Sequence, residues 1–113
     1  MKFLPQRFAI VSFGDGGFRF GDHSHLGHLL VLPSGMRAWD GVDFSLLFAE
    51  RSAIDFVLMG TGVTMVRPPK SSLNLFAAQN LAFDFMNTSS AVHTYNVMLA
   101  EKRRVAAGFV AVP

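Results

Sequence analysis

Three apolar runs decide the fold of this chain: IDFVLM at residues 54–59, LAFDFM at 81–86 and VAAGFVAV at 105–112. Nearly continuous apolar runs of this length are typical of strands that are buried on both faces of a sheet. Two stretches with helical spacing separate the runs, so the second half of the chain alternates strand, helix, strand, helix and strand. This order predicts an α/β fold in which helices cover a parallel or mixed sheet.

Both predicted helices have recognisable starting points. Pro68 and Pro69 suit the first turn of a helix, because a proline there loses no intrahelical hydrogen bond. Thr88 begins a longer helical pattern that runs to about Arg103. We interpret the polar run Thr88-Ser89-Ser90 as its N-cap, where exposed amides could also receive an anion.

The first half of the chain has the pattern of short antiparallel strands. An apolar run at 8–13 stops at the turn sequence GDGG of 14–17, and a strand with two phenylalanines on one face resumes at 18–20. Further strands are expected at 29–32 and 36–39. We predict that this half forms a β layer of its own.

Composition indicates a single domain over residues 1–113 with a substantial core. Half of the residues are hydrophobic and only 16% are charged, which is typical of a globular chain. The twelve phenylalanines lack polar groups, so we expect them in the core or on an apolar contact surface. A self-association patch, and with it a homodimer, is one expectation.

The charge balance does not favour a nucleic-acid partner. Lys and Arg total 10 against 8 acidic residues, which leaves a formal charge of +2. The dense basic cluster Lys102-Arg103-Arg104 lies at the end of the last predicted helix, where cations complement the helix dipole. One short cluster neutralises few phosphates.

Cysteine usage and hydropathy bound the compartment. The chain has no cysteine, which excludes disulfides, thiolate metal sites and a cysteine nucleophile. No apolar stretch is long enough for a transmembrane helix, and Pro5, Gln6 and Arg7 interrupt the start of the chain before a signal-peptide core. We expect a cytoplasmic protein without a transmembrane segment.

Gly60-Thr61-Gly62 is the first candidate ligand site. It follows a buried strand, and an open α/β sheet presents the carboxyl ends of its strands to ligands. The third glycine of a dinucleotide fingerprint and the lysine of a phosphate loop are both absent. Two interpretations stay open: the glycines merely turn the chain, or backbone amides near Arg67 hold a small anion.

Tyr95 and Asn96 are the other candidate ligand-binding residues. Thr94, Tyr95 and Asn96 point in successive directions around a helix, so only some of them can face one pocket. Such groups more often form hydrogen bonds from a helix to its sheet than catalyse a reaction. The structural and the ligand-binding interpretations are both retained here.

His23, His25 and His28 lie near Asp22, and imidazole and carboxylate are common metal ligands. In a strand, however, His23 and His25 share a face while His28 points away, and no helical pair of ligands occurs. We interpret this stretch as a surface loop and predict no metal site.

Enzyme chemistry has little support in the sequence. The chain lacks the G-x-S-x-G pattern of a nucleophile elbow, and nothing brings Asp55 and Asp84 together as an acid–base pair. We therefore predict no catalytic residue and no cofactor. The expected function is non-enzymatic.

Several short motifs follow one another over nearly the whole chain: FGDGGFRF at 13–20, SHLG at 24–27, LPSG at 32–35, Trp39, GTG at 60–62, TYN at 94–96 and LAE at 99–101. In this combination and order, the chain resembles a family of small uncharacterised α/β proteins. A methanogen structural-genomics protein typifies that family, which includes the mitochondrial assembly factor 3 of respiratory complex I.

The resemblance implies a three-layer fold in which a mixed, five-stranded central sheet carries helices and an additional N-terminal β layer. It implies no established enzymatic activity. For this chain it implies an assembly or scaffold protein that binds a protein partner and lies peripheral to the inner membrane through partners. The alternative function is a small-ligand or anion-binding domain, conceivably an enzyme, at Gly60 to Gly62.

Overall fold

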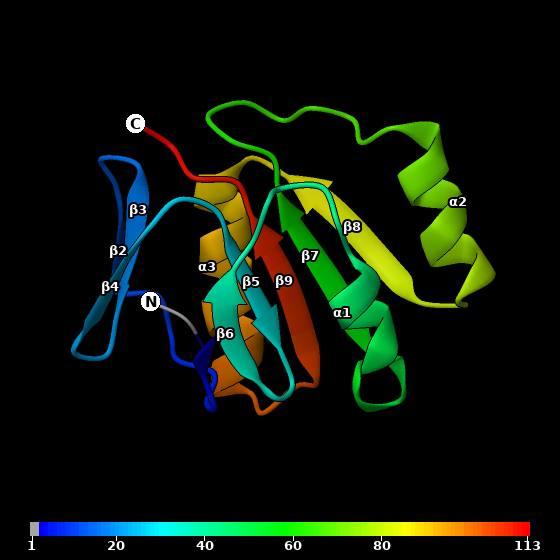
Figure 1. The fold of residues 1–113 in the computed structure, drawn as a ribbon, viewed down its shortest axis with the longest axis horizontal. Coiled ribbons are helices and arrows are strands. Elements are labelled where there is room, and N and C mark those ends of the chain that lie inside the picture. The colour runs from blue at the N-terminus through cyan, green and yellow to red at the C-terminus, as the bar shows by residue number, and fades with distance from the viewer. Residues whose placement is uncertain (1–2) are drawn as a thin grey trace.

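The computed structural model describes residues 3–113 and contains two sheets and three α-helices in that range (Figure 1). In chain order the elements are β1 (Phe3–Leu4), β2 (Ser12–Gly14), β3 (Gly17–Phe20), β4 (His23–Leu26), β5 (Leu29–Leu32), β6 (Gly35–Ala38), α1 (Ser45–Ala49), a 3-10 turn (Arg51–Ala53), β7 (Phe56–Gly60), α2 (Lys70–Ala78), β8 (Ala82–Met86), α3 (Thr88–Ala100) and β9 (Val105–Phe109).

The central sheet is mixed and has the strand order β1-β6-β5-β9-β7-β8. The three apolar runs of the second half form β7, β8 and β9, with β7 parallel to both neighbours. β5 joins this parallel part to the hairpin strand β6 and pairs antiparallel with both β9 and β6. The resemblance implies a five-stranded sheet, whereas this sheet has six strands. The additional strand is β1, whose two residues pair with the edge of β6.

Each face of the central sheet has its own core, because successive residues of a strand point to opposite faces. Leu29 and Val31 of β5 face α3 and the phenylalanines of β3, Phe18 and Phe20. Leu30 and Leu32 face α1 and α2 instead, together with other residues of a second cluster. The predicted three-layer α/β fold is confirmed: α3 and a small β sheet cover one face, and α1 with α2 covers the other.

The phenylalanines fill these cores rather than the surface. Phe44, Phe48, Phe76 and Phe83 pack together beneath α1 and α2, and the rings of Phe76 and Phe83 stack with centroids 4.1 Å apart. Offset stacking and edge contacts of this kind add to the gain from burial. Within residues 3–113, only two phenylalanines are among the exposed large apolar residues, at 40% for Phe3 and 37% for Phe13.

The predicted N-terminal β layer is only partly correct. β2, β3 and β4 form a separate three-stranded sheet, but β1, β5 and β6 join the central one. The stretch around the histidines, predicted as a loop, is largely the strand β4, which pairs with β3 along all four residues. Hydrogen bonding to β3 therefore stabilises a strand that its polar sequence did not reveal.

The hairpin predicted at the GDGG sequence is confirmed between β2 and β3. Its two turn residues, Asp15 and Gly16, have φ angles of 52° and 81°. Positive φ at both central positions fits the right-handed twist of the flanking strands, which is why Asp-Gly is favoured in such turns. The turn fixes the register in which β2 meets β3.

Candidate functional site

The carboxyl end of β7 is closed by the chain itself. The amide of Thr61 donates to the carbonyl of Met86 at 2.8 Å, and the amide of Gly62 donates to Thr88 Oγ1 at 2.9 Å. Thr88 Oγ1 in turn donates to the carbonyl of Val110 at 2.7 Å. A Cβ at Gly60 would lie 3.0 Å from the Cα of Thr88, so the glycine permits α3 to approach the strand.

This geometry assigns Thr88 a role different from the predicted N-cap. The cap of α3 is Asn87, whose Oδ1 accepts from the amide of Ser90 at 2.8 Å. Thr88 is buried in the first turn and ties β7 to the segment that follows β9. The amides of Thr61 and Gly62 are thus both occupied within the fold, while Arg67 lies exposed farther along the loop.

Tyr95 and Asn96 bind a different part of the chain. The fully buried Tyr95 donates its hydroxyl to the carbonyl of Phe8 at 2.8 Å. Asn96 donates to the carbonyl of Ile10 at 2.9 Å and accepts from its amide at 2.8 Å. The six residues predicted for a ligand site therefore fall into two groups, and the second group tethers the segment that leads into β2.

Burial determines the ionisation of Tyr95. Removing the phenol from water raises its pKa well above the usual value, because the charged form loses its hydration. The neutral hydroxyl is therefore retained as a hydrogen-bond donor to Phe8 over the whole physiological pH range. This chemistry suits a structural tether.

The histidines likewise serve the packing of the small sheet. His25 is buried, and its Nε2 lies 2.8 Å from the carbonyl of His28. His28 Nδ1 accepts from the amide of Ala111 at 2.9 Å. Residues 3–113 contain no group of three metal-ligating side chains close enough to share an ion.

The two aspartates considered for acid–base chemistry have separate surroundings. Asp55 forms an exposed ion pair with Arg104, whose guanidinium lies 2.7 Å away and lowers the pKa of the carboxyl group. Asp84 lies opposite Leu58 in the β7–β8 pairing, and its Oδ1 accepts from the amide of Phe85. The structure does not place these carboxylates as a pair.

The small sheet has an inner and an outer face, which the pairing register defines. Phe13, Phe18 and His25 are cross-strand neighbours on the inner face. The outer face carries two cross-strand rows of residues. One row is Ser12, Arg19 and Ser24, and the other is Gly14, Gly17 and Leu26. We call these six residues the outer face.

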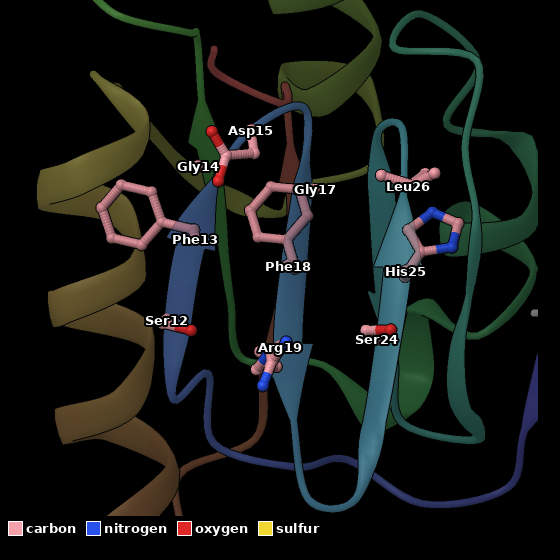
Figure 2. Close-up of a pocket in the computed structure, with 10 residues that line it drawn as sticks. All are labelled: Ser12, Phe13, Gly14, Asp15, Gly17, Phe18, Arg19, Ser24, His25 and Leu26. Atoms are coloured by element: carbon pink, nitrogen blue, oxygen red, sulfur yellow. The ribbon is translucent and has the colours of Figure 1, made fainter.

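An open hollow of about 440 Å³ lies over this sheet (Figure 2). Gly14 and Gly17 contribute no side chains to it, whereas Leu26 stands beside them with 80% of its surface exposed. That is the largest exposed fraction among the large apolar residues of the described chain. Arg19 projects from the middle strand and makes no ion pair within residues 3–113.

The outer face was not predicted from the sequence. The sequence pattern that could have indicated it is the alternation of small or polar residues with phenylalanines on both sides of the Asp-Gly turn. Pairing of the hairpin then places Ser12 opposite Arg19 and Gly14 opposite Gly17. The sequence predicted Gly14 and Gly17 as turn residues. It did not predict that both lie on one face of the paired hairpin, to which they contribute no side chains. Leu26 was part of a predicted loop.

A protein-family model matches residues 10–110, and its family is described as "Protein of unknown function (DUF498/DUF598)". The chain belongs to this family. An uncharacterized protein of Rhodobacter capsulatus is 33% identical over 105 residues, which cover 92% of this chain and 85% of the relative. The crystal structure of an outer membrane protein of Bartonella henselae, 40% identical, superposes with a TM-score of 0.92 over 96% of this chain and 98% of its own.

A more distant relative and a more distant structure agree with the family resemblance that the sequence motifs indicate. NADH dehydrogenase (ubiquinone) 1 alpha subcomplex assembly factor 3 of Danio rerio is 26% identical over 112 residues, covering 92% of this chain and 64% of the relative. The protein MT938 has the same fold, with a TM-score of 0.65 at 14% identity over 95% of this chain and 100% of its own. The DUF498 family and its fold, as indicated by the sequence motifs, are confirmed.

None of the helices within residues 3–113 combines the length and the apolar character needed to cross a bilayer.

Proposed function

We propose that this DUF498 protein is a non-enzymatic protein-binding factor in the assembly of respiratory complex I, and that its partner docks on the outer face of the small sheet. The observation that carries the proposal is Leu26, which stands 80% exposed beside a hollow bordered by Gly14 and Gly17. A single exposed apolar side chain is ordinary on a protein surface. This one borders an open hollow and lies in the row next to Arg19, and the three features together can anchor a partner segment.

The outer face also indicates the chemistry of the partner. Arg19 lies in the row next to Leu26 and has no carboxylate partner within the described chain. A guanidinium binds carboxylates in a fixed, bidentate geometry. We infer a partner segment that places an apolar side chain in the hollow and an acidic side chain at Arg19.

The distant relative named as a complex I assembly factor supports the choice of pathway. An assembly factor needs a binding surface and no catalytic centre, and the predicted polar residues Tyr95 and Asn96 are engaged in structural hydrogen bonds. We place the protein in the cytoplasm, peripheral to the inner membrane that carries the complex.

The geometry favours this function over an anion site at Gly60 to Gly62. The amides of Thr61 and Gly62, which would have to bind the anion, already donate to Met86 and Thr88. Only the exposed side chain of Arg67 would remain. Thermal stabilisation by inorganic phosphate that disappears in Arg67→Gln would support the anion site instead.

The test is affinity purification of the tagged protein from its own organism after mild crosslinking, followed by mass spectrometry. We expect complex I subunits or a second assembly factor with the unmodified chain, and their loss with Leu26→Ser. Val42→Ser is the matched control, because Val42 is 73% exposed but lies in the β6–α1 loop. Equal recovery with Leu26→Ser and Val42→Ser would contradict the proposed surface.

A second copy of the chain is the other occupant predicted from composition. Light scattering of the purified protein separates the two cases, since a homodimer through the outer face would dissociate in Leu26→Ser. A Leu26-dependent dimer that recovers no partner would replace the assembly function with self-association.

A further inference from the structure

The β7–α2 loop, residues 61–69, exposes three apolar side chains in a run of four residues. Val63, Met65 and Val66 have 69%, 64% and 56% of their surfaces exposed. Scattered single apolar residues are ordinary on a protein surface, but a contiguous group on one loop is a candidate contact. Figure 1 shows the loop beyond the carboxyl end of β7, running along the top of the view from above α3 to the start of α2.

The loop is held in shape by Thr61. Its Oγ1 donates to the carbonyl of Thr64 at 2.8 Å and accepts from the amide of Val66 at 2.9 Å. These bonds close a compact turn whose interior is polar and whose apolar side chains point outward. The apolar group is therefore presented by an ordered turn, so little conformational entropy has to be lost on contact.

The charged residues that follow this turn in the sequence have one sign. Arg67 ends the apolar group, Lys70 begins α2, and both are exposed. No acidic residue occurs between Asp55 and Asp84. In the β6–α1 loop, Asp40 and Asp43 accept backbone N–H groups of their own segment, and these bonds lower the pKa of Asp40, whose carboxylate stays charged.

We propose that the β7–α2 loop binds directly to the surface of an anionic lipid bilayer. Val63, Met65 and Val66 would enter the interfacial region, and Arg67 with Lys70 would contact anionic headgroups. Apolar side chains flanked in sequence by cations, in a stretch of the chain without acidic residues, are complementary to such a surface. The loop shares no residue with the outer face, so variants can test the two contacts separately.

The test is sedimentation of the purified full chain with vesicles. We expect binding to equimolar phosphatidylglycerol and phosphatidylcholine, and about tenfold weaker binding to phosphatidylcholine alone. The triple change Val63→Ser, Met65→Ser and Val66→Ser should abolish sedimentation. The pair Arg67→Gln and Lys70→Gln should remove the preference for the anionic lipid.

Leu26→Ser and Arg19→Gln are the matched controls, because they remove an exposed apolar side chain and a cation from the outer face. Both should sediment like the unmodified protein. The proposal is overturned if the unmodified chain does not bind the anionic vesicles, or if the loop variants bind them equally well. Loss of a protein partner in the loop variants, with unchanged vesicle binding, would show a protein contact instead.

A fluorescence measurement tests the same contact in a way that does not depend on losing binding. Met65→Trp places an indole on the loop, while the native Trp39 is only 8% exposed. Brominated phosphatidylglycerol vesicles should quench the new indole and leave Trp39 unquenched. Quenching that is identical in Met65→Trp and the unmodified chain would overturn the proposal.

Discussion

Two pairs of glycines lie at turns of this protein, and the two pairs differ in what covers them. Gly60 ends β7, and Thr88 with Ala91 of α3 fills the space where its side chain would lie. Gly62 lies two residues farther along, and its amide donates to Thr88 Oγ1. Gly14 and Gly17 flank a hairpin turn, and the hollow beside them is open to solvent. A Cβ at Gly17 would clash with the backbone carbonyl of His25, so a glycine permits close approach there as it does at Gly60. The two regions differ in that a helix covers one of them and an open hollow borders the other.

The difference arises from what lies behind each pair. α3 packs directly against β7 and β9, so any side chain at Gly60 would meet its first turn. The small sheet uses its inner face for the core, and the open hollow lies over it on the side of Gly14 and Gly17. The closed region should therefore respond to mutation through stability, and the open region through binding.

The largest effect is expected at Thr88. Thr88→Val keeps the shape but leaves the amide of Gly62 and the carbonyl of Val110 without their partner, which should lower the free energy of unfolding by about 3 kcal/mol. Thr88→Ser keeps the hydroxyl and should cost clearly less. Urea unfolding measures both, and equal costs would mean that the hydroxyl does not close this region.

A smaller loss is expected at Asn96. Asn96→Ala removes both side-chain bonds to Ile10 and should cost about 2 kcal/mol. The amides of β2, β3 and β4 should also exchange faster with solvent than those of β7 and β9. His93→Ala, at an exposed position of the same helix, is the control and should change neither quantity.

Tyr95 should make stability depend on alkaline pH. The folded pKa is raised, so above about pH 10 the unfolded phenol ionises while the folded one keeps its proton. The folded state then binds more protons, and its stability falls by about 1.4 kcal/mol per pH unit from this group. Below pH 10 the contribution is constant.

The ultraviolet absorbance of tyrosinate measures this directly, because Tyr95 is the only tyrosine in the chain. Tyrosinate should appear only as the protein unfolds, and Tyr95→Phe should show a shallower loss of stability above pH 10. Tyrosinate formation in the folded state near pH 10 would contradict the buried environment.

The smallest effect on stability is expected in the open region. Leu26→Ser should change the free energy of unfolding by no more than about 0.5 kcal/mol, since the side chain is 80% exposed. Its effect should instead be on partner recovery. A large loss of stability would show that the outer face is part of the fold's own packing.

The sequence predicted two kinds of element correctly. One kind is formed by residues close together in the sequence, such as the hairpin at GDGG, and the other is a strand surrounded by apolar residues on both faces. β7, β8 and β9 lie within the three apolar runs because strands covered on both faces need apolar residues throughout. β4 was missed because His23, Ser24 and Leu26 are exposed and only its pairing with β3 makes it a strand.

The candidate site was harder to predict because its determinants are long-range. Tyr95 and Asn96 were recognised as polar groups in need of partners, yet their partners Phe8 and Ile10 are about 86 residues away in sequence. Thr88 and Asn87 are both suitable caps, and only the position of β7 and β9 decides which one is free to cap. No local pattern contains that information.

The position of β9 has a consequence for how the protein is made. β9 is the last strand in the sequence but lies in the middle of the central sheet, between β5 and β7. A nascent chain on the ribosome therefore carries two strands with unpaired edges until residues 105–109 emerge. Such edges invite aggregation, so folding should be completed in a late, cooperative step, and chains truncated before β9 should require chaperones to stay unaggregated.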